Sequence, residues 1–234
     1  MKTAFLTLAL AATSLAAAAQ STAVASAAHP GTAAAAPTGY ADLMAATITE
    51  LLGTGDPAQL KQLASKFERA STVAPTDWLP AYYQAYALML TSFQSKEEGE
   101  VKDKYLDQAE AALARAGKQG GDASEQLVLQ AYIHQARLGI SPMTRAMKYP
   151  RLVTEALEAA KKHNPNNPRI YLVEANNVYY TPKMFGGGAA AAKPLYEQAQ
   201  TKFAAFKPAN SLAPNWGERQ LLGRLKQYNA AAAN

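Results

Sequence analysis

The sequence Leu157-Glu-Ala-Ala160-Lys-Lys-His-Asn-Pro165, continued by Asn167-Pro-Arg-Ile-Tyr171-Leu-Val-Glu-Ala175, has the pattern of two helices joined by a proline turn. An apolar residue and an alanine three positions later end the first helix, and Pro165 interrupts the chain five positions further on. A small residue, Ala175, follows ten positions later, inside the next helix. The same frame occurs three more times, the last copy being partial: Phe67, Ala70, Pro75 and Ala85; Leu113, Ala116, Gly121 and Ala131; Tyr196, Ala199 and Gly223.

The repeated frame indicates a chain built from helix pairs. Ala70, Ala116 and Ala160 are separated by 46 and 44 residues, and Ala199 follows after another 39. Paired helices that repeat every 34 to 47 residues or so are typical of α-solenoids. Small side chains belong at the crossing points, because two helices approach to about 8–10 Å there: Ala85, Ala131 and Ala175. We therefore predict an all-α fold, an α-solenoid of antiparallel helix pairs with about nine helices.

Apolar residues recur at helical spacing through most of the chain, and no window alternates long enough with the period of a strand. Helix starts are indicated by Asp56-Pro57, Asp77 and Ser124, and helix ends by glycines such as Gly121. The expected helices are residues 40–52, 56–72, 77–93, 101–116, 123–138, 149–163, 168–180 and 189–206. A ninth helix is expected to follow the connection that ends with Pro214-Asn-Trp216 and to reach about Tyr228. Three long connections are expected as loops: residues 92–100, 139–150 and 181–188.

The amino terminus has the pattern of a secretory signal peptide. Lys2 precedes an apolar run from Ala4 to Leu10, which small residues follow up to Ala19. The run is shorter than the roughly 20 apolar residues of a transmembrane helix. Cleavage is expected after Ala19, with Ala27 as the alternative. The predicted domains are a signal peptide at 1–19, a disordered Ala/Ser/Thr/Pro leader at 20–39, a helical repeat domain at 40–229 and a disordered tail at 230–234.

Composition narrows the class of protein further. No cysteine occurs among the 234 residues, so the stability of the exported chain depends on a hydrophobic core, and no cysteine is present for a lipid anchor. These features favour a periplasmic or secreted protein without a transmembrane segment. The formal net charge is +5, and removal of Lys2 leaves 22 basic and 18 acidic side chains without a dense basic block. We therefore expect no nucleic-acid partner.

None of the three histidines is spaced for metal binding. His29 lies in the leader, His134 on a helix face, and His163 at a helix end, where a positive charge is favourable. Patterns typical of serine hydrolases are absent, and Phe185-Gly-Gly-Gly188 lacks the lysine and hydroxyl residue of a P-loop. We therefore predict no metal, no cofactor and no enzymatic activity. The remaining enzymatic alternative is a hydrolase with its site under the long connections, chiefly 139–150 and 181–188.

The repeated frame resembles the tetratricopeptide-repeat family, in which a helix ends with a small residue, an aromatic residue or leucine, another alanine and then proline. The matching residues are Leu63, Phe67, Ala70 and Pro75; Ala109, Leu113, Ala116 and Gly121; Val153, Leu157, Ala160 and Pro165; Ala192, Tyr196 and Ala199. The resemblance covers about residues 56–225 and implies a right-handed solenoid, although these repeats are about ten residues longer than those of the family. The segment Asn176–Phe206 also looks like exported repeat proteins of Bacteroidetes-type bacteria.

In that family the first helix of each pair lines the inner, concave surface. The same register places a tyrosine-rich row on that surface, which we take as the candidate ligand- or partner-binding site: Tyr82, Tyr86, Tyr132, Gln135, Asn176, Tyr179 and Tyr180. Tyrosine combines an apolar ring with a hydroxyl group, and an asparagine amide binds peptide groups or carboxylates. We therefore expect a non-enzymatic binding or scaffold protein that recognises a protein, a peptide or a small ligand on this face.

Two alternatives to a binding face remain open. The tyrosines can pack as ordinary core, or the chain can be a structural subunit of an envelope complex, with its oligomeric state undetermined by the sequence. A binding face should leave Tyr86, Tyr132 and Tyr179 accessible to solvent. An assembly subunit should instead show a large apolar patch on its convex face.

Overall fold

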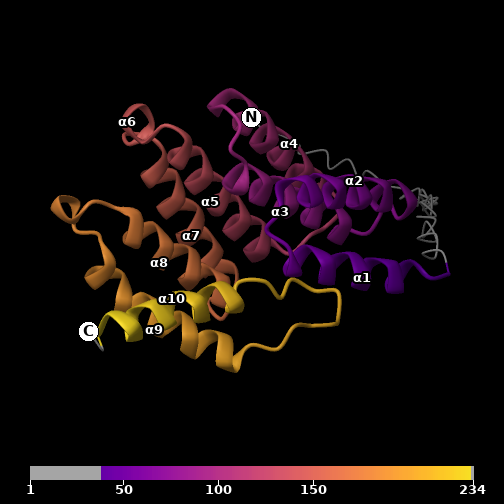
Figure 1. The fold of residues 1–234 in the computed structure, drawn as a ribbon. Coiled ribbons are helices and arrows are strands. Elements are labelled where there is room, and N and C mark those ends of the chain that lie inside the picture. The colour runs from indigo at the N-terminus through magenta and orange to yellow at the C-terminus, as the bar shows by residue number, and fades with distance from the viewer. Residues whose placement is uncertain (1–37, 233–234) are drawn as a thin grey trace, which may run out of the picture. The chain divides into compact units, whose positions relative to one another are not determined.

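The chain folds into a series of α-helices (Figure 1), described by a computed structural model for residues 38–232. The α-helices are α1 (Tyr40–Gly53), α2 (Pro57–Val73), α3 (Leu79–Gln94), α4 (Gly99–Lys118), α5 (Ala123–Ile140), α6 (Pro142–Arg145), α7 (Tyr149–His163), α8 (Pro168–Tyr180), α9 (Ala189–Ala205) and α10 (Glu218–Ala232), and η1 (Lys183–Phe185) is a 3₁₀ helix. No strand occurs in this range, so the prediction of an all-α protein is confirmed. The predicted signal peptide, and all of the predicted leader before Thr38, lie outside the described residues.

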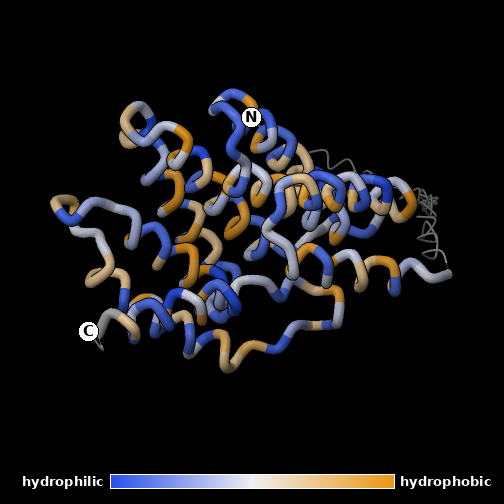
Figure 2. The backbone as a smooth tube through the Cα atoms, in the orientation of Figure 1, coloured by the Kyte–Doolittle hydropathy of each residue, from blue (hydrophilic) through white to orange (hydrophobic). Residues whose placement is uncertain are grey.

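Long helices that follow each other in the chain pack against each other, α5 and α7 included, and the four-residue α6 between them contacts α5. In addition, α3 packs against α5, and α5 packs against α8. The alanines predicted at helix crossings, Ala85, Ala131 and Ala175, are completely buried. Figure 2 shows polar and apolar residues alternating along the helices, as expected when each helix buries one face. None of the helices within residues 38–232 has the length and apolar character needed to cross a membrane.

Local sequence signals set most helix starts. The Asp56 carboxylate accepts a hydrogen bond from the Gln59 backbone nitrogen at 2.9 Å, as predicted for the cap of α2. At α5 the cap is Asp122, two residues before the predicted Ser124. Asp77 accepts a hydrogen bond from the Leu79 backbone nitrogen at 2.9 Å, and α3 begins there, two residues later than predicted.

The structure corrects the sequence prediction in two connections. Residues 139–150, predicted as a loop, contain α6, and residues 181–188 contain η1, so residues 38–232 hold ten α-helices where about nine were predicted. Pro142 suits the first position of a helix. Arg145 holds the turn by donating to Asp103 Oδ1 at 2.9 Å and to the Arg137 carbonyl oxygen at 2.8 Å. The sequence pattern did not reveal this turn because Asp103 lies 42 residues away in the chain.

Gly187 occupies a position where a side chain does not fit, because a Cβ atom would overlap the backbone carbonyl and Cβ of Thr181. We expect Gly187→Ala to lower the free energy of unfolding by about 1–3 kcal/mol, since the backbone has to shift. Gly139→Ala is the control, because its Cβ would meet nothing within 4 Å. The control should raise the free energy of unfolding by about 0.4–1 kcal/mol. Urea denaturation measures both, and an unchanged midpoint for Gly187→Ala would contradict this loop conformation.

Candidate functional site

Most of the predicted tyrosine row is buried. Tyr82, Tyr86 and Tyr132 expose 0%, 6% and 6% of their surface. Asn176 is also buried, Gln135 and Tyr179 are half-buried, and Tyr180 is exposed. The accessibility expected of Tyr86 and Tyr132 is therefore not found.

The two amide residues of the row bond to neighbouring helices. The Asn176 side-chain oxygen accepts a hydrogen bond from the Tyr196 hydroxyl at 2.7 Å. Gln135 Nε2 donates to the Val173 carbonyl oxygen at 2.7 Å. Both bonds join neighbouring helices, α8 to α9 and α5 to α8, so these side chains contribute to helix packing in the structure.

The segment 206–217, which joins α9 to α10, covers the buried tyrosines. The Trp216 ring is 2% exposed and stacks on Tyr86 with 4.8 Å between ring centroids and on Tyr132 with 5.8 Å. Its Nε1 donates a hydrogen bond to the Tyr82 hydroxyl at 2.8 Å. The segment 206–217 of the chain thus occupies the face where the sequence analysis expected a ligand.

A buried ion pair lies next to this segment. The side chains of Arg169 and Glu125 are 1% and 9% exposed. Glu125 also accepts hydrogen bonds from the Tyr82 hydroxyl at 3.0 Å and from Asn167 Nδ2 at 2.9 Å, and the Arg169 guanidinium lies 4.6 Å from the centre of the Phe206 ring. Burial raises the pKa of Glu125, and the charge and hydrogen bonds of Arg169 oppose that rise. The pair therefore connects α5, α8 and the segment 206–217.

Burial also keeps the inner tyrosines protonated. It raises the pKa of Tyr82 and Tyr86 well above the ordinary value and that of Tyr132 to about 12. A protonated phenol donates hydrogen bonds and does not act as an anionic nucleophile at neutral pH. The Tyr132 hydroxyl, for example, bonds to the side-chain amide of Gln220 at 2.9–3.1 Å.

The accessible end of the row lies between α8 and α10. Tyr180 is 72% exposed, and its hydroxyl accepts a hydrogen bond from Arg224 Nη2 at 3.0 Å. The Arg224 guanidinium carbon lies 3.9 Å from the centre of the Tyr179 ring, and Tyr228 meets Tyr179 edge to face at 6.5 Å between centroids. We call Tyr179, Tyr180, Arg224 and Tyr228 the Arg224 cluster.

Arg224 has no carboxylate partner within residues 38–232. Its remaining polar contact is with Gln227 Oε1 at 2.9 Å. Burial by itself would lower the pKa of Arg224, but the facing hydroxyls of Tyr196 and Tyr180 raise it, so the guanidinium stays charged. A ligand carboxylate would complete its hydrogen bonding, and the tyrosine rings offer a flat apolar surface beside it.

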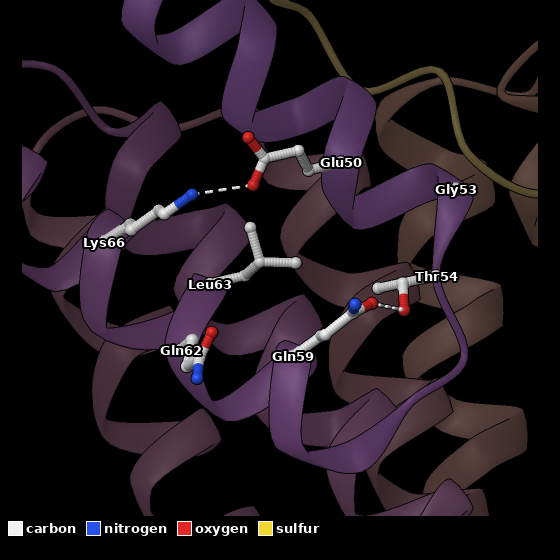
Figure 3. Close-up of a pocket in the computed structure, with 7 residues that line it drawn as sticks. All are labelled: Glu50, Gly53, Thr54, Gln59, Gln62, Leu63 and Lys66. Carbon is white, nitrogen blue, oxygen red and sulfur yellow. Dashed lines mark hydrogen bonds and ion pairs between the residues drawn. The ribbon is translucent and has the colours of Figure 1, made fainter.

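Two surface cavities lie away from this cluster. One, of about 430 Å³, lies against α1 and α2, where Lys66 Nζ pairs with Glu50 Oε2 at 2.7 Å (Figure 3). The other, of about 520 Å³, lies against α4 and α5 near Gly117 and Gln126. Neither is lined by a predicted site residue. Among residues 38–232, no three His, Cys, Asp or Glu side chains are grouped to hold a metal ion.

The connection 139–150, named above as a possible hydrolase site, is bordered by two groups with displaced pKa values. Hydrogen bonding to Arg145 lowers the pKa of Asp103, and burial lowers the pKa of His134. Asp103 is neutralised by Arg145 and by Arg137, whose nitrogen lies 3.1 Å from its carboxylate. The His134 ring packs 5.8 Å from the Tyr149 ring. These contacts hold α6 and α7 in place. The Asp103 carboxylate is paired with two arginines.

Sequence reasoning missed Trp216, Arg224 and the Glu125–Arg169 pair. A tryptophan two residues after Pro214, in a segment taken for a connection, was the available signal, because such a large apolar ring is seldom left in water. The ion pair gave no signal, since its partners are 44 residues apart.

Comparison with known proteins places the chain in a family. No protein-family model and no curated protein matches it. The solved structure of the HusA haemophore from Porphyromonas gingivalis is similar, with a TM-score of 0.73 and 33% sequence identity. The similarity covers 83% of this chain and 96% of HusA, and therefore extends over almost the whole of that protein. On this evidence the chain belongs to the family of the HusA haemophore.

Proposed function

We propose that this chain is a non-enzymatic binding protein for haem or a closely related tetrapyrrole. The observation that carries the proposal is the 33% identity, over 96% of its length, with a protein described as a haemophore. Of the partner classes predicted from the sequence, the small ligand is the one that this relationship supports.

The Arg224 cluster is the site that we propose for the ligand. A haem has flat apolar faces and propionate carboxylates at one edge. The exposed Tyr180 ring suits such a face, and Arg224 supplies a charged donor for a carboxylate. Tyr179 and Tyr180 were both in the predicted tyrosine row, so the proposal retains the part of that row that solvent reaches.

The finer architecture and the location of the chain belong to the same proposal. Sequential packing of the helices, together with the contacts of α3 with α5 and of α5 with α8, supports a right-handed solenoid of antiparallel helix pairs like that of tetratricopeptide repeats. The pattern around Lys2 supports cleavage after Ala19 and export to the periplasm or the medium. Amino-terminal sequencing of the mature protein tests the cleavage site.

Titration with haem, followed by the change in its absorption spectrum, tests the proposed site. Arg224→Gln should weaken binding by about tenfold to a hundredfold, the usual cost of losing a hydrogen bond between charged groups. Lys226→Gln is the matched control, because it removes the same charge from an exposed position of the same helix, and it should bind like the wild type.

The outcomes separate the function from its site. If the wild type binds haem no more tightly than an unrelated helical protein does, the proposed function fails. If the wild type binds haem and both variants bind it equally well, the function stands and the ligand lies elsewhere. Circular dichroism of each variant confirms that the helices are intact.

A further inference from the structure

Large apolar side chains project from the two connections at residues 141–148 and 181–188. Met143, Met147 and Met184 expose 95%, 93% and 82% of their surface, and Phe185 exposes 72%. The other methionines of the described residues, Met44 and Met89, are buried, so every exposed methionine in this range lies on these connections. Figure 1 shows α6 and the α8–α9 connection on the same side of the helices. Four such side chains in two short connections form an unusual surface feature.

Both connections have specific contacts that keep these side chains pointing outward. The first is fixed by Arg145, which bonds to Asp103 and to the Arg137 carbonyl oxygen. In the second, the Gly188 backbone nitrogen donates to the Val178 carbonyl oxygen at 2.9 Å, and the Gly186 nitrogen donates to the Lys183 carbonyl oxygen at 3.0 Å. The apolar side chains are therefore presented on shaped turns.

All charged side chains of these connections and of the starts of α7 and α9 that follow them are basic. Residues 141–151 and 181–193 contain five lysines and arginines and neither aspartate nor glutamate: Arg145, Lys148, Arg151, Lys183 and Lys193. Three of the five pair with carboxylates outside the two ranges. Lys148 and Lys183 form no ion pair within the described part of the chain. The apolar tips are thus accompanied by two uncompensated positive charges.

We propose that residues 141–148 and 181–188, here called the methionine loops, contact an anionic lipid surface. Apolar side chains at an interface enter the boundary between headgroups and acyl chains, and nearby lysines bind the negative headgroups. The loops project as separate apolar tips, and neither surface cavity is lined by their residues, so they suit a deformable surface better than a small ligand. Methionine fits this role because its flexible thioether adapts to an irregular apolar environment.

Co-sedimentation of the full chain with lipid vesicles tests the contact. We expect the wild type to bind vesicles of phosphatidylglycerol and phosphatidylcholine, and to bind pure phosphatidylcholine vesicles at least tenfold more weakly. The double variant Lys148→Gln/Lys183→Gln should lose about tenfold or more in partitioning to the anionic vesicles, since each lysine contributes about 1 kcal/mol near such a surface. The triple variant Met143→Gln/Met147→Gln/Met184→Gln should lose at least tenfold on the same vesicles.

The control variant is Leu43→Gln/Val73→Gln, which changes two apolar residues that are 59% and 54% exposed but lie on α1 and α2. It should partition like the wild type. Absence of wild-type binding to anionic vesicles, or an equal loss in this control, would overturn the proposal.

The haem titration distinguishes this inference from the proposed function. The triple methionine variant should bind haem with unchanged affinity, which would support separate surfaces for the lipid and the ligand. Weakened haem binding together with unchanged vesicle binding would assign the loops to the ligand site and overturn the lipid contact. A third outcome is a wild type that is dimeric in solution and does not bind vesicles, with a triple variant that is monomeric. That outcome would overturn the lipid contact and assign the loops to an interface with a second copy of the chain.

Discussion

Replacement of Trp216 by alanine is expected to lower the free energy of unfolding by about 3–5 kcal/mol, the range for loss of a large buried ring. The indole is 2% exposed, stacks on Tyr86 and Tyr132, and bonds to the Tyr82 hydroxyl. Its removal leaves a cavity in the interior, and the Tyr82 hydroxyl loses the hydrogen bond that it accepts while keeping the one that it donates to Glu125. Trp216 and Pro214 are the two buried side chains of the segment 206–217, so the substitution also removes most of the buried packing of that segment.

Urea denaturation followed by helical circular dichroism measures this effect. Trp216→Phe is the graded control, because it retains an aromatic ring for stacking but lacks the N–H group that bonds to Tyr82. The loss of that hydrogen bond should cost about 0.5–1.5 kcal/mol, with a further cost for the smaller ring. A change below about 1 kcal/mol for Trp216→Ala would show that the segment 206–217 does not contribute to the cooperative core.

Replacement of Arg169 by methionine is expected to cost about 3–5 kcal/mol, because it leaves the Glu125 carboxylate buried without its partner. Arg169 Nε donates to the two Glu125 carboxylate oxygens at 3.1 and 2.9 Å, and the Glu125 side chain is only 9% exposed. The Tyr82 hydroxyl and Asn167 amide remain as donors, but neither carries a charge. Thermal or urea unfolding measures the loss.

The pH dependence of the Arg169→Met variant has a definite sign. Burial raises the pKa of Glu125 even beside Arg169, and removal of the arginine should raise it further. A carboxyl group whose folded pKa exceeds its unfolded value of about 4.3 holds its proton more tightly in the folded state. Its contribution to stability is therefore full below about pH 4.3 and is lost as the pH rises toward the folded pKa. We expect the variant to be less stable at pH 8 than at pH 5.

The double variant Arg169→Met/Glu125→Gln isolates the titrating group. Because glutamine does not ionise, this variant should regain stability at pH 8 relative to Arg169→Met and should lose most of the difference between pH 5 and pH 8. Equal stability of Arg169→Met at both pH values would contradict the burial of a charged Glu125.

The helical elements could largely be predicted from local sequence. The bounds of α7 and α8 agree with the predicted ranges 149–163 and 168–180, because each helix begins with a proline in its first turn and an apolar stripe follows. The other long helices begin and end within a few residues of their predicted bounds. The turn at α6 was missed, since Asp103, from a distant helix, stabilises it.

The candidate site could be predicted only in part. Most of the predicted tyrosine row lies in the interior. At its end Tyr179 is half-buried and Tyr180 is exposed. The burial of Tyr86 and Tyr132 could not be predicted, because Trp216, which covers them, comes from a segment that looked like a connection. Arg224 was overlooked because its aromatic partner Tyr180 is 44 residues away in the chain.

The sequence by itself determined the all-α class, the order of the long helices and the alanines buried at their crossings. These features depend on periodicity and on residues a few positions apart, which any local reading contains. Only the tertiary structure decided which tyrosines meet solvent, which charges are paired and where an uncompensated arginine remains. Those properties depend on contacts such as the hydrogen bond between Trp216 and Tyr82, which are 134 residues apart in the chain. A pattern of neighbouring residues contains no information about such a contact.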